Sequence, residues 1–293
     1  MSASKRILIQ LDCDPQPSTF DAVVAVDAGA DVLLRHGGVT PANVVPLVHG
    51  AMFTRGGADL ASTAIFIGGS DVAAAEAVAG TVRDTFFGPV RVGVLVDPSG
   101  ANTTAAAAVV VAGRHVRLEP GCRALVLGGT GPVGRRVVGL LARRGATVHL
   151  ASRSAPRADA AAGALRDEVP GADVAPLAWP AVVAADSPAG HVLASADLVV
   201  AAGAAGAVLL DGPTQGLCRG PQVRIDLNAV PPAGIAGIQP TDKGRRDGEA
   251  IVWGALGVGG LKMRIHRAAI ERIFTAPDSF LDVGELLALG EAG

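Results

Sequence analysis

The sequence contains no tyrosine, and aromatic residues make up only 3% of its 293 positions. Proteins that bind single-stranded nucleic acid stack bases on aromatic side chains, and nucleic-acid binders in general present clustered basic residues. This chain has a formal net charge of −2 and no long basic run. We therefore do not expect nucleic acid as a partner.

Cysteine is equally scarce. The three cysteines, Cys13, Cys122 and Cys218, lie far apart, form no Cys-x-x-Cys pair and have no histidine at the spacing of a metal-binding motif. Such isolated cysteines are typical of buried structural thiols. We therefore expect no metal site.

Long apolar runs are also missing, although 49% of the residues are hydrophobic. A membrane-spanning helix needs roughly 18 or more apolar residues in succession, and the longest candidate, residues 103–113, stops at Arg114. The first residues do not resemble a signal peptide, because the apolar run after Lys5 and Arg6 ends at Asp12. We therefore expect a cytoplasmic protein that does not enter a membrane.

Strand-like and helix-like segments alternate along the chain in two series, which predicts an α/β fold with parallel or mixed sheets covered on both faces. In the first series we expect strands at 7–11, 32–34, 64–67 and 91–96, and helices at 19–27, from 41 to about 49, and after Asp71. In the second we expect strands at 124–127, 147–151, 198–201, 223–227 and 251–256, and helices at 132–144 and 158–168. Further helices are expected at 102–112, between the two halves, and at 261–274 and 284–289.

A glycine pattern marks a candidate nucleotide site. Gly129-x-Gly131-x-x-Gly134 directly follows an apolar strand and opens a helix, which is the context in which this otherwise weak pattern indicates dinucleotide binding. The first glycine permits a tight turn, the second allows the pyrophosphate to approach the backbone, and the third lets helix and strand pack closely. The diphosphate would lie on the N–H groups at the helix start. A glycine-rich turn without a ligand is the alternative. The residues assigned to the turn are Gly129, Thr130, Gly131, Pro132, Val133 and Gly134.

The next strand favours NADP over NAD. NAD sites usually offer an acidic residue about 20 positions after the glycine turn, whereas this chain has Ser152 and Arg153 there, with Arg157 close by. Arg153 can hold a 2′-phosphate with two hydrogen bonds and Ser152 can donate another. Gly203 and Asn228 follow later strands and are expected to border the nicotinamide.

These observations predict a two-domain α/β protein with an N-terminal α/β substrate domain and a C-terminal Rossmann-type NADP-binding domain. The substrate domain is expected to span residues 1–110, joined by the C-terminal helices 260–293. The Rossmann domain is expected to span residues 111–259.

A general base for alcohol oxidation is not evident. There is no Tyr-x-x-x-Lys arrangement, and none of the six histidines has a partner motif. His266 is expected to be structural or exposed. A substrate whose oxidised carbon is stabilised by neighbouring nitrogens needs no base, because the protein then only aligns hydride donor and acceptor.

Seven short segments, spread in order over nearly the whole chain, resemble the methylene-tetrahydromethanopterin dehydrogenases of methylotrophic bacteria. The segments are Phe20-Asp21-Ala22-Val23-Val24, Thr54-Arg55-Gly56-Gly57, Ser62-Thr63-Ala64-Ile65-Phe66-Ile67-Gly68-Gly69, Phe86-Phe87-Gly88-Pro89, Asn102-Thr103-Thr104-Ala105-Ala106-Ala107, Gly129-Thr130-Gly131-Pro132-Val133-Gly134 and Gly254-Ala255-Leu256-Gly257-Val258-Gly259-Gly260-Leu261-Lys262. That family is related in fold to the methylene-tetrahydrofolate dehydrogenases.

The resemblance implies reversible oxidation of a methylene-pterin to its methenyl form with NADP, and a homo-oligomer, trimeric or hexameric. Weaker use of NAD is expected from the site itself, because the adenosine half can bind without the phosphate contact. The resemblance also implies that the N-terminal domain binds the pterin, with Lys262 orienting it. Departures from the family pattern, such as Ala28-Gly29, leave the preferred pterin open, and tetrahydrofolate is a second candidate. The residues implied to line the pterin site are Phe20, Asp21, Thr54, Ser62, Thr63, Asn102 and Thr103.

The sequence argues against two other functions. A shikimate-type dehydrogenase should have a catalytic Lys-Asp pair in its first domain, but Lys5 is the only lysine before Lys243. A non-catalytic, redox-sensing NADP-binding protein would need a partner-binding tail, and no segment of the sequence has that character. The same lack of lysine argues against a methenyl cyclohydrolase activity, for which the related bifunctional folate enzymes use a lysine in the first domain.

Overall fold

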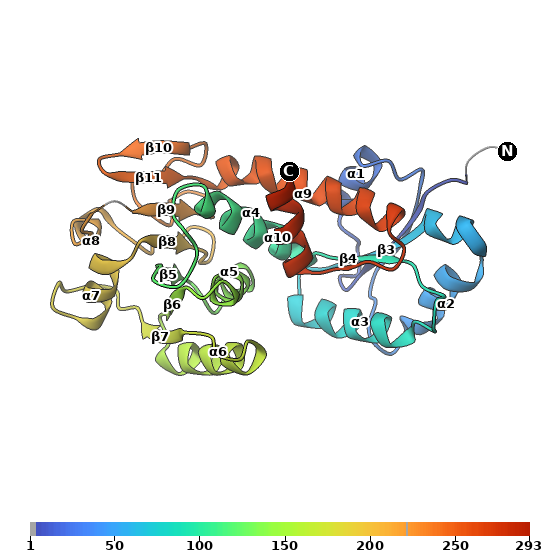
Figure 1. Ribbon diagram of the computed structural model, residues 1–293, viewed down its shortest axis with the longest axis horizontal. Coiled ribbons are helices and arrows are strands. Elements are labelled where there is room, and N and C mark those ends of the chain that lie inside the picture. The colour runs from blue at the N-terminus through green and yellow to red at the C-terminus, as the bar shows by residue number, and fades with distance from the viewer. Residues whose placement is uncertain (1–3, 221) are drawn as a thin grey trace. The chain divides into compact units, whose positions relative to one another are not determined.

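The computed structural model describes residues 4–220 and 222–293, and the chain divides into two compact units (Figure 1). Unit 1 comprises the chain up to Thr103 together with Met263–Gly293, and unit 2 comprises Thr104–Lys262. Both boundaries lie inside helices, α4 (Ala101–Gly113) and α9 (Ala255–Thr275). The boundaries expected at residues 110 and 260 fall within the same two helices.

Unit 1 is built on a five-stranded sheet in the order β12-β4-β3-β1-β2, and every pair of neighbouring strands is parallel. The parallel α/β sheet predicted from the alternating pattern is thus confirmed. The strands are β1 (Ile7–Asp12), β2 (Val32–His36), β3 (Thr63–Gly68), β4 (Gly93–Val96) and β12 (Phe280–Leu281).

Helices cover both faces of this sheet. Successive side chains of a strand point to opposite sides, and β3 is buried at every position, so both faces need a covering layer. On one face Ile65 and Ile67 of β3 share a core with residues of α2 and α3. On the other face Phe66 stacks on the fully buried ring of His266 from α9, with 5.8 Å between ring centroids. Besides α9 from Met263 onward, the helical segments of unit 1 are α1 (Thr19–Asp27), α2 (Val45–Phe53), α3 (Val72–Thr85), α10 (Val283–Ala292) and the 3-10 turns η1 (Gly57–Ser62) and η2 (Pro98–Gly100).

Unit 2 has the strand order of a Rossmann domain. Its seven-stranded sheet runs β10-β11-β9-β8-β5-β6-β7, parallel except for the antiparallel pair β10 and β11. The order reverses between β5 and β8, as in doubly wound nucleotide-binding domains. The predicted Rossmann-type domain is therefore confirmed. The strands are β5 (Arg123–Leu127), β6 (Thr147–Ser152), β7 (Val174–Ala178), β8 (Leu198–Ala201), β9 (Val223–Asp226), β10 (Lys243–Asp247) and β11 (Ala250–Trp253).

The helices of unit 2 pack on this sheet through apolar side chains. On one face Leu193 of α7 shares a core cluster with Leu125 and Leu127 of β5. The amphipathic helix α5 buries Val137, Val138 and Leu141. The helices are α5 (Pro132–Arg143), α6 (Ala155–Glu168), α7 (Pro188–Ser195) and α8 (Gly212–Gln215).

Two helix starts differ from the sequence-based expectation. Residues 41–44 form a turn rather than a helix, and α2 begins at Val45 with Pro46 in its first turn, a position that proline tolerates well. The expected strand at 251–256 ends at Trp253, and α9 begins at Ala255 rather than near residue 261. Gly257 lies in the first turn of α9, where a Cβ would be only 2.0 Å from the Asp242 carbonyl oxygen. Glycine there serves a close backbone approach and does not interrupt the helix.

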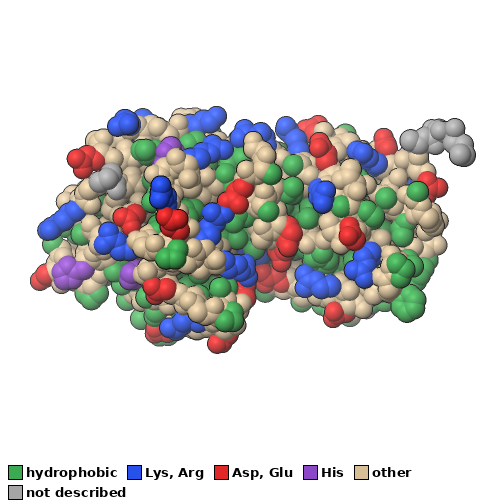
Figure 2. All heavy atoms as spheres, viewed as in Figure 1, with side chains coloured by type: hydrophobic (Ala, Val, Ile, Leu, Met, Phe, Trp, Pro, Cys, Tyr) green, Lys and Arg blue, Asp and Glu red, His purple; other side chains and the backbone are tan. Residues whose placement is uncertain are grey.

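No helix in the described part of the chain is both long and apolar enough to span a bilayer. On the face shown in Figure 2, cationic and anionic side chains are interspersed over the surface.

The close contact between α5 and β5 yields a stability prediction. A Cβ on Gly134 would lie 2.3 Å from the Gly128 carbonyl oxygen, whereas a Cβ on Gly163 of α6 would meet nothing within 4 Å. We expect Gly134→Ala to lower the free energy of unfolding by roughly 1–3 kcal/mol through overpacking. Gly163→Ala should instead raise it by about 0.4–1 kcal/mol. Urea denaturation measures both, and equal stabilities of the two variants would contradict the packing argument.

Candidate cofactor-binding site

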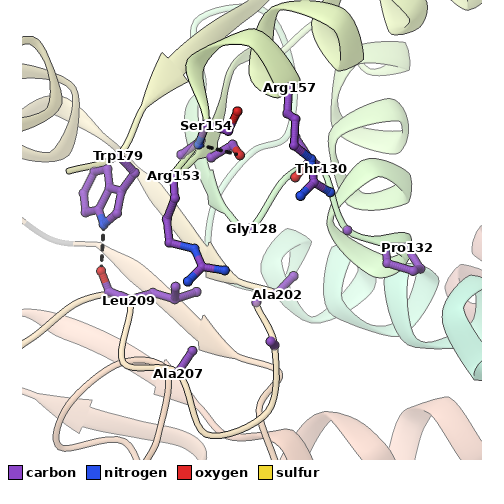
Figure 3. Close-up of a pocket in the computed structure, with 15 residues that line it drawn as sticks. Gly128, Thr130, Pro132, Arg153, Ser154, Arg157, Trp179, Ala202, Ala207 and Leu209 are labelled. Carbon is purple, nitrogen blue, oxygen red and sulfur yellow. Dashed lines mark hydrogen bonds between the residues drawn. The ribbon is translucent and has the colours of Figure 1, made fainter. Parts of the chain in front are cut away.

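A cavity of about 590 Å³ opens at the carboxyl ends of β5, β6 and β8 in unit 2 (Figure 3). This volume is in the range of small-molecule sites, and the cavity lies where the strand order reverses, the usual ligand position in open α/β sheets. Its lining residues are Gly128, Thr130, Gly131, Pro132, Ala151, Ser152, Arg153, Ser154, Arg157, Trp179, Ala202, Gly203, Ala204, Ala207 and Leu209.

The turn between β5 and α5 forms one wall, and its conformation differs in one respect from the expected roles. Gly128 has a φ of +73°, a backbone angle that favours glycine. The tight turn assigned to Gly129 is therefore made by the residue before it. Gly129 is instead packed against β6, because a Cβ there would lie 2.8 Å from Cγ of Leu150. Gly134 serves the predicted close packing of helix and strand.

The start of α5 can receive an anion. Gly131 is the N-cap and Pro132 occupies the first turn, and among the described residues no side chain caps this helix. N–H groups at a helix N-terminus carry partial positive charge and bind phosphate groups. Thr130, Gly131 and Pro132 line the cavity, whereas Gly129, Val133 and Gly134 support the turn without lining it.

Two arginines give the cavity its charge. Arg153 and Arg157 are both exposed, and the described lining residues include no aspartate or glutamate. In Figure 3 Arg157 lies near Thr130, while Arg153 extends toward the segment that carries Leu209. Ser152 is buried at the end of β6, where its hydroxyl oxygen accepts the Ser154 N–H at 3.3 Å. The three residues predicted to contact a 2′-phosphate thus line one cavity.

Sequence reasoning missed Trp179, and of the segment after β8 it assigned only Gly203 to the site. Trp179 is 7% exposed, and its indole N–H donates to the Leu209 carbonyl oxygen at 2.8 Å. Strand β7 was not predicted, because it contains Pro176, and proline is rare inside strands. A usable signal was present, since Trp179 follows β7 as Arg153 follows β6, and residues after the carboxyl ends of parallel strands are the ones that meet ligands.

Gly203 and Asn228 are placed apart. Gly203 lines the main cavity, but Asn228 lines a separate cavity of about 320 Å³ formed largely by residues 230–240. The Asn228 side chain is held in its own loop, donating to the Pro232 carbonyl oxygen and accepting the Val230 N–H, each at 3.0 Å.

Buried Asp226 organises that loop. Its carboxylate accepts the N–H groups of Asn228 and Ile235 at 3.0 and 3.1 Å. Burial raises the pKa of Asp226, and these N–H groups oppose the rise.

The residues that the resemblance implies for the pterin site lie at both ends of the unit 1 strands, some where the strands begin and others where they end. Thr63 pairs with Ile7 where both strands begin, whereas Asp12 pairs with Gly68 where they end. These ends are separated by roughly 17 Å, at about 3.3 Å per residue. The members of the set at the beginning of β3 are Thr63 itself, half-buried Ser62 and exposed Thr54, at the end of α2.

The other members follow the carboxyl ends of the strands. Phe20, 55% exposed, and buried Asp21 lie in the first turn of α1, which follows β1. Asn102 and Thr103 begin α4, after β4, and are fully buried. The Asp97 carboxylate accepts both of their backbone N–H groups at 3.0 Å and the Thr103 hydroxyl at 2.6 Å. Asn102 and Thr103 therefore fasten the start of α4.

Lys262 lies in α9 and is half-buried. His266, one turn further along the same helix, belongs to the core rather than the surface. The structural role expected for His266 agrees with its stacking on Phe66.

Comparison with known structures supports the fold. Quinate dehydrogenase from Corynebacterium glutamicum, solved in complex with NAD, superposes with a TM-score of 0.53 and covers 99% of this chain and 100% of its own. At 14% sequence identity this likeness establishes the fold alone.

Comparison of sequences goes further. The family model for the N-terminal part of methylene-tetrahydromethanopterin dehydrogenase matches residues 19–99. The bifunctional protein MdtA of Methylorubrum extorquens is 42% identical over 292 residues, which cover 98% of this chain and 99% of that protein. The NAD(P)-dependent methylenetetrahydromethanopterin dehydrogenase of the same organism is 30% identical over 271 residues, 89% of each chain. With this identity extending over almost its whole length, the chain belongs to the methylene-tetrahydromethanopterin dehydrogenase family.

Proposed function

We propose that the chain is an NADP-dependent oxidoreductase that converts methylene-tetrahydromethanopterin to its methenyl form in one-carbon metabolism. Family membership supports a nicotinamide-dependent dehydrogenase of this pterin, since a relative that matches most of the chain carries that name. The observation that favours NADP is the cavity at the glycine turn, which has two arginines and no carboxylate among its described lining residues.

The chain's residues fit a dinucleotide. A Cβ on Gly131 would lie 3.3 Å from the Gly128 carbonyl oxygen and 3.6 Å from the Ala202 carbonyl oxygen. Gly128 and Ala202 both line the cavity, so glycine at position 131 keeps this part of it open for a diphosphate. Ser152, Arg153 and Arg157 would hold the adenosine ribose and its 2′-phosphate, and Gly203 would lie toward the nicotinamide. Asn228 would also border the nicotinamide, from the loop whose backbone N–H groups Asp226 accepts.

The proposed reaction does not require acid or base catalysis by a side chain. Bound NADP would supply the hydride acceptor. The substrate carbon lies between two nitrogens that stabilise the resulting cation, so no residue has to remove a proton. The protein must hold the two reacting carbons roughly 3–3.5 Å apart. The task of this chain is therefore binding and orientation.

The pterin contacts are proposed more narrowly than the family resemblance implies. Phe20 offers an exposed ring on α1, and Lys262 offers a cation on α9, so these two are our first candidates for direct contact. Asn102 and Thr103 would act indirectly, by holding the start of α4 through Asp97.

One screen tests the proposal against its alternatives. Methylene-tetrahydromethanopterin and methylene-tetrahydrofolate are each offered with NADP and with NAD, and reduced coenzyme is followed by its absorbance. We expect the fastest turnover with the methanopterin and NADP, with slower use of NAD. NADP binding without turnover of either pterin would favour the redox-sensing protein instead.

We further propose a homo-oligomer, trimeric or hexameric, located in the cytoplasm. Size-exclusion chromatography with light scattering tests the assembly, and a monomeric mass would refute that part.

The arginine assignment gives a specific prediction. Arg153→Ala should weaken NADP binding on the order of 10- to 100-fold, because it removes a charge-assisted contact worth roughly 1.5–3 kcal/mol. NAD, which lacks the 2′-phosphate, should lose little affinity. Isothermal titration with both coenzymes measures the difference.

The matched control is Arg166→Ala, which removes an exposed arginine near the end of α6, outside the lining of the cavity. This variant should leave both affinities unchanged. Equal losses of NADP and NAD affinity in Arg153→Ala would refute the 2′-phosphate assignment.

A second prediction concerns what the enzyme does not do. No lysine occurs between Lys5 and Lys243, and we therefore expect no methenyl cyclohydrolase activity. The measurement is the decay of the methenyl absorbance in buffer with and without protein. Faster decay with the protein would show that the bifunctional character named for one relative extends here to hydrolysis.

A further inference from the structure

The segment after β8, residues 202–209, has few side chains with which to fix its own shape. It contains two glycines and four alanines, and residues 204–206 are exposed. Five of its residues nevertheless line the cavity: Ala202, Gly203, Ala204, Ala207 and Leu209. They form the wall of the cavity next to the glycine turn, where a Cβ on Gly128 would lie 2.8 Å from the Gly203 backbone. The contacts that hold this segment therefore also set the shape of the cavity.

The segment is held at both ends: at its start the Ala202 N–H donates to the Leu127 carbonyl oxygen at 2.8 Å, and at its far end Leu209 makes several contacts. The Leu209 N–H donates to the Gly234 carbonyl oxygen at 2.8 Å, and the Leu209 carbonyl oxygen accepts the Trp179 indole N–H at 2.8 Å. The Leu209 side chain packs against Gly203, where a Cβ would lie only 2.6 Å from Cδ1 of Leu209. Gly203 therefore packs between Leu209 and Gly128, whose own Cβ would be 2.8 Å from the Gly203 backbone.

Trp179 reaches this segment from the other end of the cavity. Its backbone N–H donates to the Ser152 carbonyl oxygen at 2.8 Å, so it is fixed beside the residues proposed for the 2′-phosphate. Its ring is part of the core cluster that contains Leu125 and Leu193, with Leu209 packed against that cluster. In Figure 3 Trp179 and Leu209, joined by their hydrogen bond, stand on one side of Arg153.

We propose that Trp179 is a positioning residue for the adenosine half of NADP. It ties the end of β7 to the segment after β8 and so sets the cavity wall that faces Arg153. The inference rests on the proposed function, because it takes the cavity as the NADP site. In a Rossmann domain the diphosphate lies at the glycine turn and the ribose at the end of the next strand, which places the adenosine over β6 and toward Trp179.

The same contacts extend to the loop beyond β9. Gly234, which accepts the Leu209 N–H, lies against Asp226, so that a Cβ there would be 2.8 Å from Oδ1. Asp226 in turn holds the N–H of Asn228. Gly234 thus lies between the adenosine wall and the Asn228 loop, but that loop has its own hydrogen bonds, from the Asn228 and Ile235 N–H groups to Asp226, and these remain when the Trp179 N–H is absent.

The test compares the two tryptophans of the chain. Trp179→Phe keeps an aromatic ring but removes the N–H, leaving the Leu209 carbonyl oxygen without this donor. We expect the Kd for adenosine 2′,5′-bisphosphate and the KM for NADP to rise roughly 3- to 10-fold, the effect of one net hydrogen bond. The kcat at saturating coenzyme should stay near that of the wild type, because the reacting carbons are held elsewhere.

The matched control is Trp253→Phe. Trp253 is 5% exposed and also donates its indole N–H to one acceptor, Nε2 of His115, at 3.1 Å, but it does not line the cavity. Its loss should leave the Kd for adenosine 2′,5′-bisphosphate unchanged. Equal affinities in the two variants would overturn the proposal, as would a kcat loss in Trp179→Phe without a change in KM.

A second measurement covers the case in which Trp179→Phe does not fold. In Trp253→Phe the only indole is Trp179, and adding adenosine 2′,5′-bisphosphate should change its emission because the cavity beside it becomes filled. An unchanged emission at saturation would overturn the proposal. Failure of the wild type to bind the bisphosphate would instead overturn the NADP site itself.

Discussion

The contact between the Gly134 backbone and the Gly128 carbonyl oxygen determines how closely α5 can approach β5. Because neither residue has a Cβ, the helix begins directly over the end of the strand, and its first N–H groups face the space above the sheet. Gly131 leaves that space open. The rest of the candidate site depends on the close approach of α5 to β5. A larger side chain at Gly134 would push the helix outward and move its positive end away from the cavity.

The other walls of the cavity follow from the parallel sheet. β6, β7 and β8 end side by side with β5, so the residues after them meet around one space although they are distant in sequence. Each strand end contributes something different. β6 contributes a cation, β7 an aromatic ring with a donor, and β8 a segment of small residues that depends on that donor. Charge, shape and rigidity thus come from three separate connections.

The sequence predicted the parts of the fold that local chemistry determines. Ser18 and Asp71 accept N–H groups at the starts of α1 and α3, and both helix starts were predicted correctly. The short helices α7 and α8 were missed although Ser187 and Asp211 cap them locally, whereas the missed strands β12 and β7 depend on tertiary pairing. β12 has two residues and exists because it lies beside β4, and β7 contains a proline at the position that pairs with Leu150. Gly257 lies inside a helix because the backbone of Asp242 passes against it, and no local pattern shows such an approach.

The site was predictable to a similar extent. Arg153, Arg157 and the glycine turn follow from spacing, because the βαβ unit has a nearly constant geometry. Trp179 required knowledge that β7 is a strand. The pterin residues came from resemblance, which identifies segments but does not distinguish a side chain that meets a ligand from one that holds a helix, as Asn102 and Thr103 do at Asp97.

The division of the chain also bears on its synthesis. Unit 2 is continuous in sequence, whereas unit 1 is interrupted by it and is completed only by the last residues. As the chain leaves the ribosome, all strands of unit 2 emerge before β12, which starts at Phe280. Until then one side of β4 lacks its neighbouring strand, and an unpaired strand edge readily pairs with other chains. The nascent protein therefore has a longer period of exposure to aggregation at its N-terminal unit than at its central one.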